Sequence, residues 1–287
     1  MQRPLWRKLS IIINELWPIC RCCTKWIGNG VIKELLMSYQ LSLQDGLGLL
    51  TLQMPEKSNL LTPELSEAIA AALTQLFVDP ALKVFAVQGS GRSFCAGADL
   101  QALQQASQGD GAVLKALYSA FRAVAECPVL SVALVNGAAT GAGMNLAMAC
   151  DIRVAAADAW FESRFFQLAI HPGGGHTALL PQQIGWQQAA AMLLAGERLQ
   201  AVEAQRLGFV KALLPTEELE TYARGLARKV ADVPGDLLRL TKQSMREFSG
   251  TPDLAHAVDV EYQRQFASIQ TSVARERIAA LLARISS

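Results

Sequence analysis

Two glycine-rich turns constrain the fold of this chain more than any other feature of its sequence. The first, "GSGRSFCAGADL", spans 89–100, and the second, "NGAATGAGMNLAMACD", spans 136–151. Each turn follows a short apolar run and leads into a sequence that predicts a helix. Such a turn leaves backbone N–H groups free at the positive end of the helix. Both turns are therefore candidates for binding an oxygen atom or an anion.

Strands and helices alternate around these turns, which predicts an α/β fold with parallel strand pairing. From Glu217 onward, four amphipathic helical stretches follow without a strand signal. Such helices either pack on a partner subunit or fold back on the core of their own chain. The predicted elements before them are a hairpin over 39–54 that turns at Asp45-Gly46, a helix from Pro63 with Thr62 as its N-cap, strands at 83–89, 129–137 and 152–158, and helices at 111–127 and 141–151.

Composition excludes several classes of function. With 51% hydrophobic and 18% charged residues, the 287-residue chain has the composition of a globular protein. Its net charge of +1 gives no indication of nucleic-acid binding. We expect a cytoplasmic protein that acts on a small molecule, with no nucleic-acid or membrane partner. The cysteines match neither a disulfide framework nor a zinc site built from two cysteine pairs, and we expect Cys95, Cys127 and Cys150 to be buried thiols.

The first 36 residues differ from the rest of the chain. Their apolar run "LSIII" is too short to span a membrane, and no signal-peptide cleavage site follows it. The "CRCC" cluster leaves palmitoylation or metal binding as alternatives. Lys33-Glu34 can be encoded by AAGGAG, a bacterial ribosome-binding sequence, shortly before Met37. We therefore expect 1–36 to be a disordered or non-native leader, followed by a core domain at 37–215 and a helical region at 216–287.

Several known uses of glycine-rich turns compete at this stage. "GSGRSF" lacks the Lys-Ser/Thr pair of a phosphate-binding P-loop. "TGAGMN" is a weak dinucleotide fingerprint, because no ribose-binding acid is evident downstream, so a nucleotide-binding oxidoreductase is a minor alternative. Tight helix–strand packing through small residues explains either turn alone. Two turns that hold one oxygen from two sides would form an oxyanion hole.

Taken together, five motifs resemble the crotonase superfamily of enoyl-CoA hydratases and isomerases. They are "MPEKSNLLTPEL", "SFCAGADL", "PVLSVALVNGAATGAGMNLAMACDIRVAAADAWF", "HPGGG" and "AQRLGFVKALLP". The resemblance covers nearly the whole chain after Met37. It implies a crotonase-like spiral of ββα units with a helical C-terminal trimerisation region, assembled as a homotrimer or a dimer of trimers. It also implies an acyl-CoA thioester substrate, as in fatty acid metabolism, and no cofactor.

The resemblance assigns the oxyanion hole to two backbone groups. Ala98 would supply one N–H to the thioester carbonyl, and Ala142 would supply the other from the start of a helix. Because both donors belong to the backbone, the positions require only small side chains. The residues that the resemblance implies for CoA and acyl binding are Lys57 and Ser58 near the adenine, Leu60, Ala96, Gly97, Asp99 (also a helix cap), Leu100, Thr140, Gly143 and Phe165.

Both glutamates that activate water in a hydratase of this superfamily are replaced. Asn145 occupies the position of the first, and Phe165 that of the second. An amide can orient a water molecule but cannot take its proton, and a phenyl ring can do neither. Glu162 is three residues from the second position, and an odd offset on a strand points a side chain to the opposite face. Glu162 is therefore not expected to replace the missing acid.

Other groups remain for proton transfer. His176 precedes Thr177, as the nucleophilic aspartate precedes a threonine in the dehalogenase branch of the superfamily. We predict it as an acid or base, with a helix-start histidine bonded to backbone as the alternative. Tyr118 is a further candidate donor, whereas His171 is expected to be structural. Arg164 either binds a substrate carboxylate or lies on the surface.

The sequence thus predicts an acyl-CoA enzyme of isomerase, decarboxylase or otherwise divergent type. A catalytically idle acyl-CoA-binding or assembly subunit is the alternative. We expect the polar segment 101–115 to be a mobile loop that shapes the acyl pocket.

Overall fold

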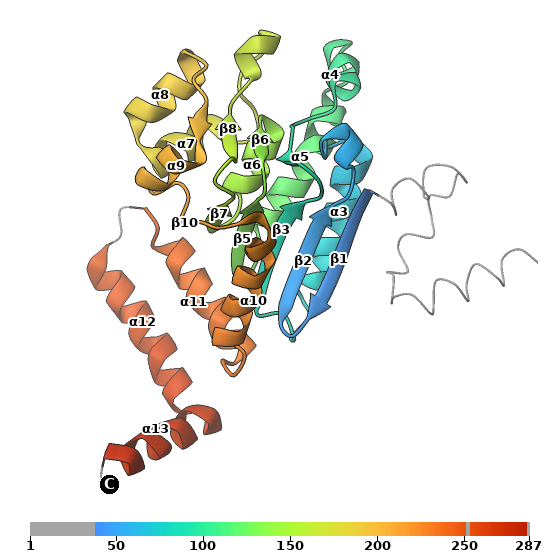
Figure 1. Cartoon of the computed structure of the whole chain (residues 1–287). Helices are drawn as coiled ribbons and strands as arrows, with labels where there is room; N and C mark the ends of the chain where they lie inside the picture. The colour runs from blue at the N-terminus through green and yellow to red at the C-terminus, as the bar shows by residue number, and fades with distance from the viewer. Residues whose placement is uncertain (1–37, 251–252, 286–287) are drawn as a thin grey trace, which may run out of the picture.

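The fold begins with the hairpin that the sequence predicts (Figure 1). The computed structural model describes residues 38–250 and 253–285, so the expected leader with its cysteine cluster lies outside the described residues. Strand β1 (Tyr39–Gln44) pairs antiparallel with β2 (Leu47–Leu52). Asp45 and Gly46 between them have φ values of 49° and 79°. Aspartate and glycine tolerate this left-handed conformation, which matches the twist of the paired strands.

The remaining strands of the main sheet are parallel. The sheet has six strands in the order β1-β2-β3-β5-β7-β10. The α/β class with parallel pairing is therefore confirmed. The strands added to the hairpin are β3 (Val84–Gly89), β5 (Leu130–Val135), β7 (Ile152–Ala155) and β10 (Ala212–Leu213).

A second sheet, which the sequence did not predict, accounts for the spiral. Its order is β4-β6-β8-β9, and the first two of these strands lie inside the glycine-rich stretches. Each of β3, β5 and β7 leads into one short strand of this sheet before a helical segment follows, which gives the expected ββα units. The four strands are β4 (Ser93–Cys95), β6 (Ala138–Thr140), β8 (Trp160–Glu162) and β9 (Leu199–Gln200).

Helices cover both faces of the main sheet (Figure 1). Helix α3 (Pro63–Leu76) begins as expected, with the Thr62 hydroxyl accepting the Leu65 N–H at 3.1 Å. The expectation of a mobile loop over 101–115 is wrong. That segment forms helix α4 (Leu100–Ser107) and the start of α5 (Gly111–Ala125), because Ala102 is buried and Asp110 caps α5 by accepting the Ala112 N–H.

One part of the C-terminal helical region folds back on the core, which is one of the two alternatives that the sequence left open. Helix α10 (Leu219–Lys229) folds back on the main sheet and buries Leu219, Ala223 and Ala227 against it. Helices α12 (Leu254–Ile269) and α13 (Ser272–Ile285) extend away from the core and carry exposed apolar side chains, Tyr262 and Phe266 among them (Figure 1). In the described part of the chain, no helix is both long and apolar enough to cross a membrane.

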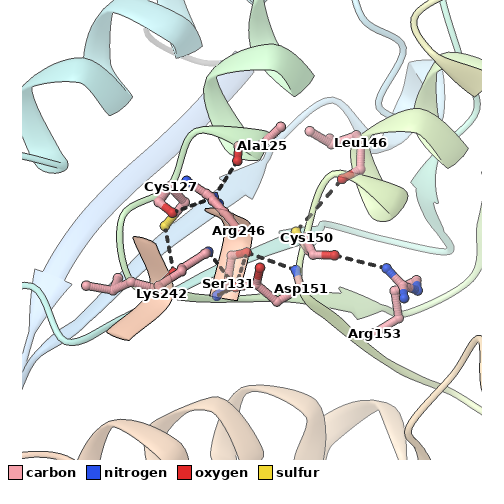
Figure 2. Close-up of polar contacts among 10 residues, drawn as sticks. Ala125, Cys127, Ser131, Leu146, Cys150, Asp151, Arg153, Lys242 and Arg246 are labelled. Carbon is pink, nitrogen blue, oxygen red and sulfur yellow. Dashed lines mark hydrogen bonds and ion pairs between the residues drawn. The ribbon is translucent and has the colours of Figure 1, made fainter. Parts of the chain in front are cut away.

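Helix α11 (Gly235–Glu247) is held to the core by a charged network (Figure 2). Lys242 Nζ donates to Asp151 Oδ2 at 2.5 Å and to the Val129 carbonyl at 2.6 Å. The same carboxylate oxygen accepts the Ser131 N–H at 2.7 Å and its hydroxyl at 2.9 Å. Asp151 lies shortly after helix α6 (Ala142–Met148), so the network ties the C-terminal helices to the helix that starts in the second glycine turn.

The three scattered cysteines are buried free thiols, as expected. Burial raises the pKa of the Cys127 thiol to about 11 and the pKa of the Cys95 thiol to about 12. The pKa of Cys150 is also raised by burial. Protonated thiols of this kind behave as small apolar side chains.

Replacing Lys242 by methionine is expected to destabilise the fold. The change removes the charged partner of Asp151, which keeps the two donors of Ser131, and removes the ammonium donor from the Val129 carbonyl. Because Asp151 is partly exposed, we expect a loss of about 1–3 kcal/mol in the free energy of unfolding. Urea denaturation measures it, with the exposed Lys229→Met as the matched control. Equal stability of the two variants would contradict a role for the network.

Candidate active site

The two glycine-rich turns meet at one edge of the second sheet. Strands β4 and β6 are parallel neighbours, with Ser93 paired to Ala138, so both turns leave the same edge. A Cβ atom on Gly97 would lie 3.1 Å from the Thr140 carbonyl oxygen and 3.8 Å from the Ala142 nitrogen. The Thr140 hydroxyl also donates to the Ala96 carbonyl at 2.7 Å. The turns are thus in direct contact.

Each turn contains a backbone N–H group that donates to no other group in the part of the chain that the structure describes. The first turn bonds to the preceding segment through its neighbours, with Leu61 N–H donating to Gly97 and Asp99 N–H donating to Leu61, which leaves the Ala98 N–H on the other side. Ala142 is the first residue of α6. Within 38–250 and 253–285, neither N–H donates a hydrogen bond. Both are free for a ligand oxygen, as the predicted oxyanion hole requires.

Glycine is needed in the second turn for packing as well as for shape. Gly141 caps α6 with φ 51°, and a Cβ on Gly143 would lie 2.0 Å from the Cys95 carbonyl oxygen. No real Cβ contact is that short, so α6 lies on β4 only because residue 143 has no side chain. Tight helix–strand packing through small residues, one of the alternatives that the sequence left open, therefore explains Gly143. A role of Gly143 in substrate binding stays a prediction.

The segment that carries the predicted CoA residues borders the first turn. Lys57 ends the short helix η2 (Pro55–Lys57) and is exposed, and Leu60 is half-buried nearby. The Ser58 carbonyl accepts the Ala96 N–H at 3.0 Å. Leu100, at the start of α4, is 61% exposed. The contact supports one common surface, and the assignment of these residues to CoA stays a prediction.

Asn59 organises this segment, and the sequence analysis missed it. Its side chain is fully buried, accepts the Met54 N–H at 2.9 Å and donates to the carbonyls of Ser90 at 2.9 Å and Ser93 at 2.8 Å. Its φ of 56° is a conformation that asparagine tolerates, so an asparagine in "EKSNLL" was the available signal.

Asp99 was predicted as a helix cap. It takes the N-cap position of α4, but its side chain makes no capping hydrogen bond.

Hydrogen bonds link three buried polar side chains near the second turn. Asn145 Oδ1 is 2.6 Å from His176 Nδ1, and His176 Nε2 is 2.9 Å from Ser163 Oγ. Asn145 Nδ2 donates to the Gly173 carbonyl at 2.9 Å. The exposed fractions of the three residues are 2%, 0% and 4% in the same order.

The Gly173 carbonyl fixes the direction of these hydrogen bonds. A carbonyl oxygen only accepts, so the Asn145 amide nitrogen must face it and the amide oxygen must face His176. His176 Nδ1 then carries the proton, and Nε2 of the neutral ring accepts the Ser163 hydroxyl. Burial lowers the pKa of His176 from 6.5 to about 4, so the ring is neutral at pH 7. The alternative of a histidine bonded to backbone is wrong, because both ring nitrogens contact side chains.

Phe165 and Tyr118 lie beside these three hydrogen-bonded side chains. Phe165 begins the short helix η3 (Phe165–Leu168), and its ring centroid is 5.0 Å from the His176 ring, edge to face. Tyr118 packs so closely on the 173 loop that a Cβ on Gly173 would lie 2.2 Å from its hydroxyl. His171 is exposed, and its Nδ1 bonds the Pro172 carbonyl at 2.7 Å. The structure therefore brings together His176, Asn145, Phe165 and Tyr118 but leaves out His171.

Glu162 points elsewhere, as expected. It pairs with Arg164 at 2.9 Å and Arg198 at 3.3 Å. Burial by itself raises the pKa of Glu162, but the hydrogen bonds and charges of these arginines outweigh it and hold the pKa below its ordinary value. The expected reason was wrong, however. Strand β8 ends at Glu162, and Arg164 with φ 55° turns the chain into η3, so no strand continues to Phe165.

Ser163 was not considered in the sequence analysis. It stands two residues before the predicted Phe165, in a serine–arginine pair that matches no motif. Only its contact with His176, which lies 13 residues further along the chain, gives it chemical interest.

Comparisons with known proteins cover most of the chain. The family model for enoyl-CoA hydratase/isomerase matches residues 42–283. A probable enoyl-CoA hydratase of Mycobacterium tuberculosis is 39% identical over 247 residues, covering 84% of this chain and 95% of that protein. The 1,2-epoxyphenylacetyl-CoA isomerase of Escherichia coli is 33% identical over 257 residues, covering 88% and 98%. The crystal structure of an enoyl-CoA hydratase from Bacillus anthracis has a TM-score of 0.78 and 28% identity, covering 86% and 96%.

The fold and these matches define a member of the crotonase superfamily, which confirms the resemblance seen in the sequence. More narrowly, the chain belongs to the enoyl-CoA hydratase/isomerase family. It is an acyl-CoA enzyme, a lyase or isomerase of that family. This membership decides against the nucleotide-binding oxidoreductase that the turns alone had left open.

The burial of His176 predicts a pH-dependent stability. Since the folded-state pKa of about 4 lies below the ordinary 6.5, the unfolded chain binds a proton more readily, and stability is lost as the pH falls from 6.5 toward 4. Between pH 7 and pH 5 we expect His176 to account for a loss of about 2 kcal/mol. Urea denaturation at both pH values should show this loss in the wild type and its absence in His176→Gln. Parallel pH dependences of the two proteins would contradict it.

Proposed function

We propose that this enzyme stabilises a thioester enolate between the N–H groups of Ala98 and Ala142, and that its proton chemistry is of isomerase or decarboxylase type. The observation that carries the proposal is the replacement of the two glutamates by an uncharged arrangement. Asn145 is committed to His176 and Gly173, and Phe165 packs its ring on the imidazole. Neither side chain can take a proton from water.

The geometry supports the first half of this chemistry directly. Removing a proton from the carbon next to a thioester places negative charge on the carbonyl oxygen. Two backbone donors aimed at that oxygen stabilise the charge, and in comparable sites each donor is worth about 3–4 kcal/mol. Ala98 and Ala142 offer such donors from turns that touch each other.

The second half of the chemistry falls to the groups beside the network. The neutral His176 ring has an acceptor at Nε2, which Ser163 occupies, and Tyr118 is the nearby phenol. We propose these two, His176 and Tyr118, as the groups that move the substrate proton. The isomerase name of the Escherichia coli relative supports a reaction that shifts a proton without adding water.

We also propose which residues bind CoA and how the subunits assemble. Lys57, Ser58, Leu60 and Leu100 would hold the CoA, since their segments border the first turn. The exposed apolar side chains of α12 and α13 support a homotrimer or dimer of trimers, in which partner subunits would cover them. We propose a cytoplasmic protein that needs no cofactor.

A second candidate function is an acyl-CoA binder without turnover. The observation that favours it is the burial of Asn145, His176 and Ser163, whose exposed fractions are all 4% or less. With these three side chains buried, the oxyanion hole would bind a thioester, but none of the three would reach the substrate to transfer a proton.

Hydration of crotonyl-CoA is expected to be far slower than about 10² s⁻¹, the upper part of the usual range for enzymes. In D2O, by contrast, the α-protons of a saturated acyl-CoA should exchange, as mass spectrometry measures. Ala142→Pro removes one donor at the first position of α6, where a helix accepts proline, and should slow the exchange about 10²–10³-fold.

Two outcomes would overturn these expectations. Turnover of crotonyl-CoA at ordinary hydratase rates would refute the isomerase-type proposal. Binding of the acyl-CoA with no exchange and no turnover would favour the idle binder.

A further inference from the structure

Ser163, His176 and Asn145 form a hydrogen-bonded relay. The replacement of the two glutamates does not explain why Ser163 is part of it. The serine hydroxyl lies 2.9 Å from a histidine nitrogen, and the opposite nitrogen of that ring lies 2.6 Å from an amide oxygen. A hydroxyl becomes a nucleophile when a base lies within hydrogen-bond reach and a third group orients the base. An asparagine serves as the third group in some cysteine–histidine sites, so a carboxylate is not required.

The backbone of Ser163 also lies near the turn that carries one of the proposed oxyanion donors. Strand β8 pairs with β6 so that Glu162 lies opposite Thr140, and the Gly141 N–H donates to the Glu162 carbonyl at 3.0 Å. Ser163 follows at once, and its carbonyl oxygen would lie 3.7 Å from a Cβ on Gly141. Ala142 is the next residue of the turn. Nucleophile and donor thus come from neighbouring ends of two paired strands.

A small hollow borders Ser163. It is lined mainly by apolar side chains, among them Phe165, Phe166, Pro172, Met192 and Leu193. Arg164 and Gln167 also line it, so the hollow gives Ser163 both apolar and polar neighbours.

From these observations we propose that Ser163 is an acyl acceptor, and that the enzyme hydrolyses acyl-CoA thioesters through an acyl-serine intermediate. The inference rests on the proposed function only in that the thioester carbonyl oxygen is bound by Ala98 and Ala142. It requires no enolate.

The reaction balances without an oxidant or a reductant. Ser163 Oγ bonds to the thioester carbon while its proton passes to His176 Nε2, and the carbonyl oxygen takes up negative charge between the two N–H donors. The C–S bond then breaks, and the CoA sulfur receives the proton from Nε2. In the second stage a water molecule attacks the ester carbon, the proton passes again through Nε2, and the C–O bond to Ser163 breaks to release the carboxylic acid.

The test follows three readouts with butyryl-CoA and octanoyl-CoA. Free CoA is measured with a thiol reagent, α-proton exchange in D2O is measured by mass spectrometry, and acid-quenched protein is digested to find an acylated peptide. We expect the wild type to release CoA and to carry the acyl group on Ser163. Ser163→Ala should release CoA at least 100-fold more slowly and carry no acyl group.

Ser119→Ala is the matched control, because the Ser119 hydroxyl bonds only the Ala116 carbonyl of its own helix. It should behave as the wild type. If Ser163→Ala does not fold, the acylated peptide of the wild type decides the question by itself.

The outcomes separate this inference from the proposed function. α-Proton exchange without CoA release, or CoA release that is equal in Ser163→Ala, overturns the acyl-serine and leaves the enolate proposal intact. CoA release with an acylated Ser163 but without exchange supports the acyl-serine and overturns the enolate proposal.

Discussion

The close approach of α6 to β4 is the contact on which the rest of the site depends. Gly143 has no side chain, so the helix lies directly on the Cys95 carbonyl, and the parallel pairing of β4 with β6 then brings the two turns together. The free N–H of Ala142 therefore faces the turn that carries Ala98. The same helix carries Asn145 one turn further on, so the position of the proposed donor Ala142 also sets the position of the buried network.

Much of this architecture could be predicted because its signals are local. The Asp45-Gly46 turn, the Thr62 cap and the strand–turn–helix pattern around Ala142 each depend on a few consecutive residues. The strands of the second sheet were missed because three residues are too few to show a hydrophobic period. The segment after Asp99 was misjudged because its polar side chains hid a helix that buries little more than Ala102.

The chemistry of the site was predictable only in part. Counting along the motifs located Asn145 and Phe165, and the resemblance pointed to His176. What these residues do to one another depends on side-chain contacts between segments that lie 13 to 31 residues apart. No pattern in one sequence reports such contacts. Ser163 belongs to no recognisable motif, and the motif that contains Asn59 does not say which groups its side chain bonds.

The hydrogen bond between Asn145 and Gly173 has a consequence for how this site can change during evolution. The Gly173 carbonyl belongs to the main chain, and it dictates which way the amide faces and hence which imidazole nitrogen carries the proton. Residue 173 has no room for a side chain, because a Cβ there would lie 2.2 Å from the Tyr118 hydroxyl. The direction of these hydrogen bonds is therefore set by the backbone of the loop and by the contact between Gly173 and Tyr118, and any activity that uses His176 would have to keep both.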